Sequence, residues 1–310
     1  MTTETQIIAR LRRIATDPAA RGLADDAALL DGLVITHDTI AEGVHFLPFD
    51  PPASVGWKLV AVNLSDVAAK GARPRAALLS MCIGDPDWDE LFLDGVEAAC
   101  ESYGLSLIGG DTIALPAGAP RVLGMTAIGA AGERVPSRSG ARPGDIVWVI
   151  GTLGDSACGL QQLQADAKST GFLVEKYRRP VPLLADGQAL AREASAMMDV
   201  SDGLLIDLER LCDASGCRAE IDLDALPLSR AFIAERGQDR RARLFAATGG
   251  DDYALLAALP EGIDPLALPL PSDSTIAAVG RLAKGRAIAL HDADGPIELP
   301  ERMGYEHRRD

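Results

Sequence analysis

The sequence predicts a two-domain protein, an α+β sheet layer followed by an α/β domain. The chain has 310 residues, 47% of them hydrophobic and 24% charged, which is enough apolar material for two cores. In the first half the expected elements follow a β-α-β-α-β-β order, which favours one sheet with helices on one face. A polar stretch rich in Gly, Pro and Arg, 132–144, separates the halves. We therefore place the boundary near Pro136 and assign the domains to residues 1–136 and 137–310.

The first half alternates amphipathic stretches with short apolar runs. Ile7, Ile8, Leu11 and Ile14 recur at helical spacing and predict a first helix. A buried strand at 33–35 is expected to end in the polar residues that follow it. The remaining expected elements are strands at 76–83, 105–108 and 121–129, a helix at 88–103, and a helix capped by Ser54 and ended by Gly71.

The second half begins with a strand, 146–150, and a tight turn of sequence Gly-Thr-Leu-Gly-Asp-Ser. This turn is not a Walker loop, because the Gly-Lys-Ser/Thr ending is missing, and no such motif occurs in the chain. Further expected elements are helices at 181–194 and 204–211 and strands at 219–223, 254–259, 275–280 and 287–290.

Charge and composition exclude several classes of partner. The net charge of −15 argues against nucleic acid and anionic membrane surfaces, although divalent cations would still allow a polyphosphate to bind. The five cysteines are odd in number and form no Cys-x-x-Cys pair, so we expect most of them to be small buried residues of a reduced, cytoplasmic protein. There is no signal-peptide core and no apolar run of 18 residues, so the protein is expected to be soluble.

Carboxylates recur where apolar runs or glycines meet polar residues. Each cluster alone is best explained as a turn, but together they predict one shared pocket. Two carboxylates ~4 Å apart repel by ~4 kcal/mol at an effective dielectric near 20, so a convergent set needs cations. With five lysines in the chain and all-oxygen ligands, Mg²⁺ is the expected cation, and a nucleotide polyphosphate the expected ligand. The clusters are Asp25-Asp26, Asp38, Asp66, Asp111, Asp199 with Asp202, and Asp251-Asp252.

Two further groups of residues have both a structural and a functional interpretation. Asn63, Asp66 and Lys70 share one face of the helix at 54–71, and a carboxylate in so apolar a segment needs a cation. The arginines of the 132–144 stretch, among them Arg138, are either solvated linker residues or bidentate ligands for phosphate.

Read in order, the motifs resemble the thiamine-monophosphate kinase family, within the superfamily that includes aminoimidazole ribonucleotide synthetase and selenophosphate synthetase. The resemblance spans essentially the whole chain. The residues that carry it are Asp25-Asp26-Ala27, Thr36-His37-Asp38-Thr39, Glu42-Gly43-Val44-His45-Phe46, Asn63-Leu64-Ser65-Asp66, Gly109-Gly110-Asp111-Thr112, Arg138-Ser139-Gly140, Asp199-Val200-Ser201-Asp202-Gly203 and Gly250-Asp251-Asp252-Tyr253.

The resemblance implies a role for each matching residue. It also implies a homodimer in which the N-terminal sheets of the two subunits pair and the second domain closes over the cleft. Several Mg²⁺ ions would be held by Asp26, Thr36, His37, Asp38, Asp66, Asp111, Asp199 and Asp202. ATP, the co-substrate, would contact Gly110, Asp111, Arg138, Ser201 and Tyr103, and thiamine monophosphate would face His45, Asp251 and Tyr305. Asp38, Asp66 and Asp111 would serve the reaction most directly.

The implied reaction is ATP-dependent phosphorylation of thiamine monophosphate to the diphosphate. The acceptor is a phosphate oxygen that is already anionic at neutral pH, so no general base is required. Catalysis then consists of positioning and screening two anions, which predicts direct in-line transfer without a phosphoenzyme. For Tyr305, a C-terminal tyrosine, packing remains the alternative to cation–π contact with the thiazolium ring.

Three positions depart from the family pattern, and two other functions stay open. Ala24 replaces the usual glycine, His37 replaces Ser/Thr beside Asp38, and Asp251 replaces a glutamate that is one methylene longer. The first alternative is another ATP-dependent synthetase of the superfamily. The second is a non-catalytic, cation-dependent nucleotide-binding protein.

Overall fold

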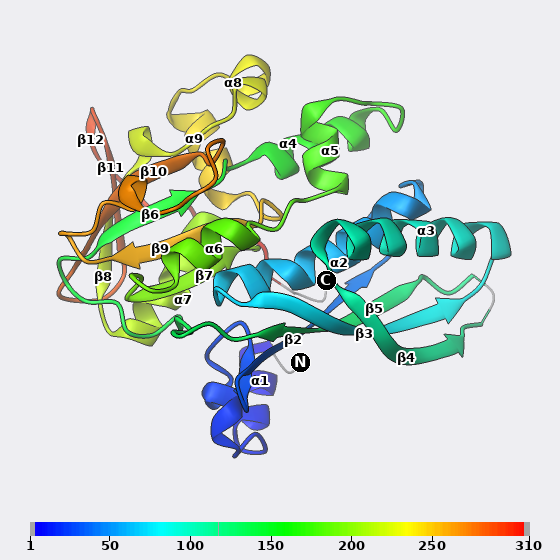
Figure 1. The fold of residues 1–310 in the computed structure, drawn as a ribbon. Coiled ribbons are helices and arrows are strands. Elements are labelled where there is room, and N and C mark those ends of the chain that lie inside the picture. The colour runs from blue at the N-terminus through cyan, green and yellow to red at the C-terminus, as the bar shows by residue number, and fades with distance from the viewer. Residues whose placement is uncertain (1–3, 117, 307–310) are drawn as a thin grey trace.

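The computed structural model describes residues 4–116 and 118–306, which form two sheets with helices packed on them (Figure 1). The predicted α+β and α/β organisation in two domains is confirmed. The predicted boundary at Pro136 falls in the stretch between the last strand of the first sheet and the first strand of the second, and its position stays a prediction. A short helix, α1 (Glu4–Arg12), precedes the first sheet and projects below it in Figure 1.

The first sheet has the order β1-β2-β5-β3-β4, and all of its pairs are antiparallel except β3 with β4. Helices α2 (Pro52–Ala69) and α3 (Pro86–Tyr103) both cover the same face, the upper one in Figure 1. The strands are β1 (Ala28–Leu30), β2 (Leu33–Ala41), β3 (Arg73–Ile83), β4 (Ser106–Ala114) and β5 (Val122–Ala130).

Two glycines allow α2 and α3 to touch backbone to backbone. A Cβ built on Gly95 would lie 2.0 Å from the carbonyl oxygen of Ala53, and one on Gly56 would lie 2.2 Å from that of Phe92. No real side chain tolerates such distances, so these positions require glycine for close helix packing. Helix α2 also carries Asp66, which is buried ten residues beyond Gly56.

The second sheet has the order β12-β11-β8-β10-β6-β9-β7 and is mixed, because β11 and β8 are parallel while the other pairs are antiparallel. Its strands are β6 (Ile146–Ile150), β7 (Ala196–Val200), β8 (Arg218–Asp222), β9 (Ala254–Leu259), β10 (Ile276–Ala283), β11 (Ile288–Asp292) and β12 (Gly295–Ile297). Its helices are α4 (Asp155–Ala165), α5 (Phe172–Arg178), α6 (Leu184–Leu190), α7 (Leu204–Ser215), α8 (Arg230–Arg236) and α9 (Arg240–Thr248).

Helix α2 belongs to both halves of the molecule. Its residues from Val55 to Ala69 are almost all buried, and Ala68 and Ala69 share one hydrophobic cluster with residues of the second half such as Leu190 and Met197. A helix that is apolar on all sides must be buried on all sides. The first sheet, α3 and the second half of the molecule bury α2 in this way. The two halves therefore share a core along this helix.

Several sequence-based boundaries were wrong. The polar residues after Ile35 do not follow a strand end, because β2 pairs with β5 along its whole length from Leu33 to Ala41. Asp111 likewise lies inside β4. Helix α2 begins earlier than predicted, after Pro51, and Ser54 does not cap it. The helix expected at 181–194 is restricted to α6, and helices α5, α8 and α9 were not predicted.

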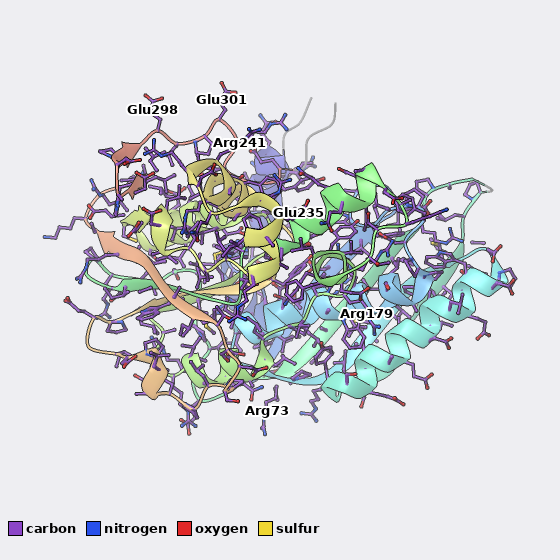
Figure 2. The ribbon with its side chains drawn as sticks, turned by 90° about the horizontal axis from the view of Figure 1, so that it is seen from above. Arg73, Arg179, Glu235, Arg241, Glu298 and Glu301 are labelled. Carbon is purple, nitrogen blue, oxygen red and sulfur yellow. The ribbon has the colours of Figure 1, made fainter. Side chains whose placement is uncertain are left out.

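The surface carries most of the charged groups, and Figure 2 shows Arg73, Glu298 and Glu301 at the periphery. All five cysteines are free and buried, whereas burial was predicted for most of them. None of the helices in the described part of the chain has the combined length and apolarity of a membrane span. Strands β3 and β4 also expose apolar side chains, namely Leu78, Leu107, Ile108 and Ile113.

Candidate active site

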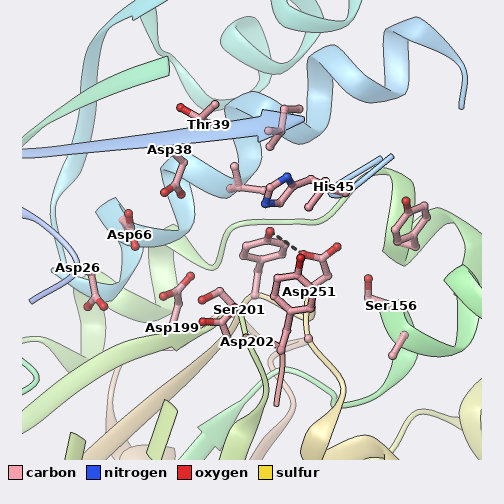
Figure 3. Close-up of a pocket in the computed structure, with 18 of the residues that line it drawn as sticks. Asp26, Asp38, Thr39, His45, Asp66, Ser156, Asp199, Ser201, Asp202 and Asp251 are labelled. Carbon is pink, nitrogen blue, oxygen red and sulfur yellow. Dashed lines mark hydrogen bonds between the residues drawn. The ribbon is translucent and has the colours of Figure 1, made fainter. Parts of the chain in front are cut away.

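A cavity of about 430 Å³ lies between the two halves of the molecule. The predicted site residues that line it come from segments far apart in the sequence, and they gather at two ends (Figure 3). One end is acidic, and the other contains His45, Asp251 and Ser156. The predicted residues in the lining are Asp26, Asp38, His45, Asp66, Arg138, Asp199, Ser201, Asp202, Asp251 and Tyr305.

Three carboxylates converge at the acidic end. One ligand oxygen of each of Asp26, Asp66 and Asp199 lies within 4.8 Å of the others. Asp26 precedes β1, Asp66 lies on α2, and Asp199 lies near the end of β7, so the cluster forms only when both halves pack together. The Thr36 hydroxyl donates to Asp66, and the Ser65 hydroxyl donates to Asp199 at 2.6 Å.

Burial and mutual repulsion oppose ionisation of this cluster. Burial, followed by the charges of Asp38 and Asp199, raises the pKa of Asp66 well above its usual value. Burial and the charge of Asp26 raise the pKa of Asp199 to about 8. Burial likewise raises the pKa of Asp38, which lines the same end, to about 6. Carboxylates that resist ionisation without a cation are suited to bind one.

Two basic side chains already compensate Asp26. Arg138 binds its Oδ1 through Nε at 2.6 Å, and the Lys70 ammonium lies 2.5 Å from its Oδ2. Although burial alone would raise it, the pKa of Asp26 is lowered by the charges of Lys70 and Arg138. Oδ2 is buried against the Lys70 ammonium, and because a carboxylate oxygen has two lone pairs it can still accept a second cation.

Asp202 belongs to a hydrogen-bonded turn with Asp207 and Arg210, two residues that were not predicted from the sequence. Asp207 Oδ2 accepts from the backbone N–H groups of Ser201, Asp202 and Gly203, at 3.0 to 3.2 Å. Arg210 donates to Asp202 at 2.5 Å and to Asp207 at 2.7 Å. An aspartate in the first turn of a helix that follows a glycine is a recognisable capping signal and could have identified Asp207. Arg210 lies three residues after Asp207 on the same helix, and this spacing could have indicated their ion pair.

At the other end of the cavity, Asp251 is fixed by two partners. Its carboxylate accepts from Lys58 Nζ at 2.7 Å and from the Tyr253 hydroxyl at 2.9 Å (Figure 3 shows the latter bond). Asp251 and Tyr253 both have positive φ, 68° and 51°, a conformation that costs non-glycine residues on the order of 1 kcal/mol. The Lys58 ammonium, 4.0 Å from the Tyr177 ring centroid, also donates to the carbonyl of His45. Sequence reasoning identified Asp251 but missed its partners.

Two predicted substrate residues complete this end. His45 Nδ1 accepts from the backbone N–H of Ala41 at 3.1 Å, which orients the ring. The Tyr305 N–H donates to the carbonyl of Asp202 at 2.9 Å, so the C-terminal segment folds back over the cavity. Tyr305 as a residue is 45% exposed and borders the cavity without being packed in the core.

Five predicted residues do not line the cavity. Thr36 lies directly beneath it, bonded to Asp66. His37 points to the opposite face of β2 from Asp38, where Nδ1 lies 2.9 Å from the Thr126 hydroxyl. The other three are Tyr103, Gly110 and Asp111.

Strand register explains where these last three lie. Asp38 pairs with Met125 of β5, which pairs with Leu79 of β3, which pairs with Gly110 of β4. Gly110 and Asp111 are thus three strands away from Asp38, on the order of 14 Å, within one chain. Tyr103, at the end of α3, packs edge-on against Trp57.

The same two-part division is found in known proteins. Residues 24–131 match the family described as AIR synthase related protein, N-terminal domain, and residues 142–289 match its C-terminal domain. Hydrogenase maturation protein HypE, at 22% identity and a TM-score of 0.69, shares the fold. Fold and cleft thus define a member of the AIR synthase related class.

Relatives narrow the class. Thiamine-monophosphate kinase of Salmonella typhimurium is 42% identical over 252 residues, which cover 77% of this chain and 76% of that protein. The enzyme of Caulobacter vibrioides is 35% identical, with 98% of this chain and 91% of that protein covered. A solved structure of AaThiL complexed with AMPPCP and TMP is 31% identical, with a TM-score of 0.86 and coverage of 99% and 97%. The chain belongs to the thiamine-monophosphate kinase family.

Proposed function

We propose that this protein transfers the terminal phosphoryl group of ATP to thiamine monophosphate, yielding thiamine diphosphate. The observation that carries the proposal is the single cavity with a carboxylate cluster at one end and an aromatic, carboxylate-bearing recess at the other. Support comes from the relative AaThiL, solved with AMPPCP and TMP bound. Because ATP is the donor, we place the reaction in the cytoplasm.

The acidic end fits Mg²⁺. Its donors are hard carboxylate oxygens, three of them within 4.8 Å of one another. We propose Asp26, Asp66 and Asp199 as ligands, with Asp38 and Asp202 at the edge of the cluster. When bound, Mg²⁺ would neutralise phosphate oxygens and screen the two substrates from each other.

The chain's own residues would hold the two substrates in line. Arg138, whose side chain is 23% exposed, can exchange Asp26 for a nucleotide phosphate, and Ser201 borders the same space. At the recess, Asp251 supplies a fixed negative charge for the cationic thiamine, and Tyr305 offers a ring face to it. Since the acceptor oxygen is anionic at pH 7, these residues orient the substrates and remove no proton.

We further propose that the protein acts as a homodimer through the exposed face of the first sheet. Leu78 on β3 and Ile113 on β4 are apolar and exposed in the single chain, and β4 is an edge strand. Asp111 and Gly110 lie on this strand, and His37 is exposed on β2. Within one chain Asp111 is too distant from the acids, so we propose that it acts on the site of the partner subunit.

The decisive experiment measures thiamine diphosphate formed from thiamine monophosphate, ATP and Mg²⁺, with ADP measured in parallel. Equimolar diphosphate and ADP support the proposal. ATP binding without turnover on thiamine monophosphate contradicts it and favours a binding protein. A different phosphorylated or cyclised product indicates another synthetase of the class. With chiral [γ-¹⁶O,¹⁷O,¹⁸O]-type ATP, inversion at phosphorus supports direct transfer, whereas retention indicates a phosphoenzyme.

A further inference from the structure

Lys70, at the C-terminal end of α2, is completely buried although it carries a charge. Its ammonium contacts three oxygens: Asp25 Oδ1 at 2.5 Å, Asp26 Oδ2 at 2.5 Å and the carbonyl of Met197 at 3.0 Å. An ammonium without water is costly unless acceptors surround it, and here two hydrogen bonds and one ion pair do so.

These three contacts connect all parts of the carboxylate cluster. Asp25 and Asp26 precede β1, while Met197 lies two residues before Asp199 on β7. Asp66 lies one helical turn before Lys70 on the same face of α2. One ammonium thus ties together the segment that carries Asp26, the strand that carries Asp199 and the helix that carries Asp66.

Lys70 differs from the other cation at this cluster. The Arg138 side chain is 23% exposed and borders the cavity, so it can turn toward an incoming phosphate. The Lys70 side chain has 0% exposure and lies behind the acids, where no phosphate can reach it. Its charge therefore stays with the carboxylates whether or not a substrate is bound.

We propose that Lys70 is a positioning residue, a fixed internal cation that holds Asp26, Asp66 and Asp199 together before Mg²⁺ binds. This inference rests on the proposed function, because it takes Mg²⁺ to be the ion that the carboxylates bind. Without Lys70, the free energy of Mg²⁺ binding must also assemble the carboxylates. Folding then becomes dependent on Mg²⁺, and more Mg²⁺ is needed for activity.

The test compares Lys70→Met with Lys58→Met. Both variants remove a buried ammonium from α2, but Lys58 contacts Asp251 at the opposite end of the cavity. In EDTA we expect Lys70→Met to lower Tm by about 10 °C, and Mg²⁺ to restore at least half of the loss. In Lys58→Met any loss of Tm should not respond to Mg²⁺ beyond the wild-type response.

Kinetics give a second readout. For Lys70→Met we expect the Mg²⁺ concentration at half-maximal activity to rise about tenfold, with kcat at saturating Mg²⁺ changed far less. For Lys58→Met we expect the KM for thiamine monophosphate to rise, with the Mg²⁺ requirement unchanged. Equal effects of the two variants on Mg²⁺ dependence would overturn the proposal.

A charge-matched double variant guards against a folding defect. Lys70→Met with Asp26→Asn removes the cation together with the carboxylate partner that repels Asp66 and Asp199. We expect it to melt higher in EDTA than Lys70→Met alone, whereas a role in packing alone predicts no rescue. The melting experiments need no turnover. A wild type that makes no thiamine diphosphate would therefore refute the proposed function and leave the test of Lys70 intact.

Discussion

Replacing Asp66 by asparagine should make the metal-free protein more stable and nearly abolish its activity. Asparagine keeps the shape of the side chain and can still accept from Thr36, but it removes one charge from the cluster. At a separation of 4.8 Å each ionised pair among the three acids repels by ~3.5 kcal/mol at an effective dielectric near 20. A proton relieves part of this repulsion, because the pKa of Asp66 is already raised by burial and by Asp38 and Asp199.

We therefore expect Asp66→Asn to gain ~2 kcal/mol of unfolding free energy in EDTA, which is roughly 4 °C in Tm. Activity should fall more than about a hundredfold, or ~2.7 kcal/mol of lost transition-state stabilisation. Calorimetry in EDTA and in Mg²⁺, together with the diphosphate assay, measures both quantities. Asp94→Asn, an exposed acid on α3, is the matched control and should change neither. A lower metal-free Tm, or activity within tenfold of wild type, refutes the reasoning.

Three other predictions concern separate parts of the molecule. Lys58→Met leaves the carboxylate of Asp251 without its charged partner. The KM for thiamine monophosphate should therefore rise about tenfold in steady-state kinetics, while the KM for ATP stays unchanged. A change in the KM for ATP alone would argue against this prediction. Burial, followed by the charge of Asp26, raises the pKa of Asp199 to about 8, so the folded metal-free state holds a proton that the unfolded chain releases above about pH 4. Relative to Asp199→Asn, the metal-free wild type should lose stability as pH rises from about 4 to about 8 and less so in Mg²⁺, by thermal melting; a relative gain over that range contradicts this. Leu78→Glu should convert a dimer into monomers in light scattering, and a dimer that persists would exclude the proposed face.

The sequence around individual acids was sufficient to predict that several of them meet in one pocket. Asp66 was recognisable because it interrupts an apolar helix, and Asp199 because it follows an apolar lead. Their convergence with Asp26 in one cavity agrees with that reasoning. Local pattern succeeds here because a carboxylate in an apolar setting is costly and needs a partner.

Strand register and long-range partners could not be predicted. The pattern around Asp111 looks the same at a strand end as in its middle, and only the pairing of β4 with β3 shows that it is remote from Asp38 within one chain. Lys70 was noticed for its helix face, yet its contact with the Met197 carbonyl joins residues far apart in the sequence. The strained turn at Asp251 and Tyr253 also depends on tertiary contacts that no local signal specifies.

Helix α2 is buried by both halves, and this has a consequence for how the protein folds. A chain cut at the predicted boundary would leave Ala68 and Ala69 uncovered on one fragment, and Leu190 and Met197 uncovered on the other. Neither fragment has a complete interior of its own, so heat or denaturant should melt the molecule in one cooperative step. The N-terminal and C-terminal family domains of this chain are thus a single unit of folding. The cavity between them forms only when both are folded.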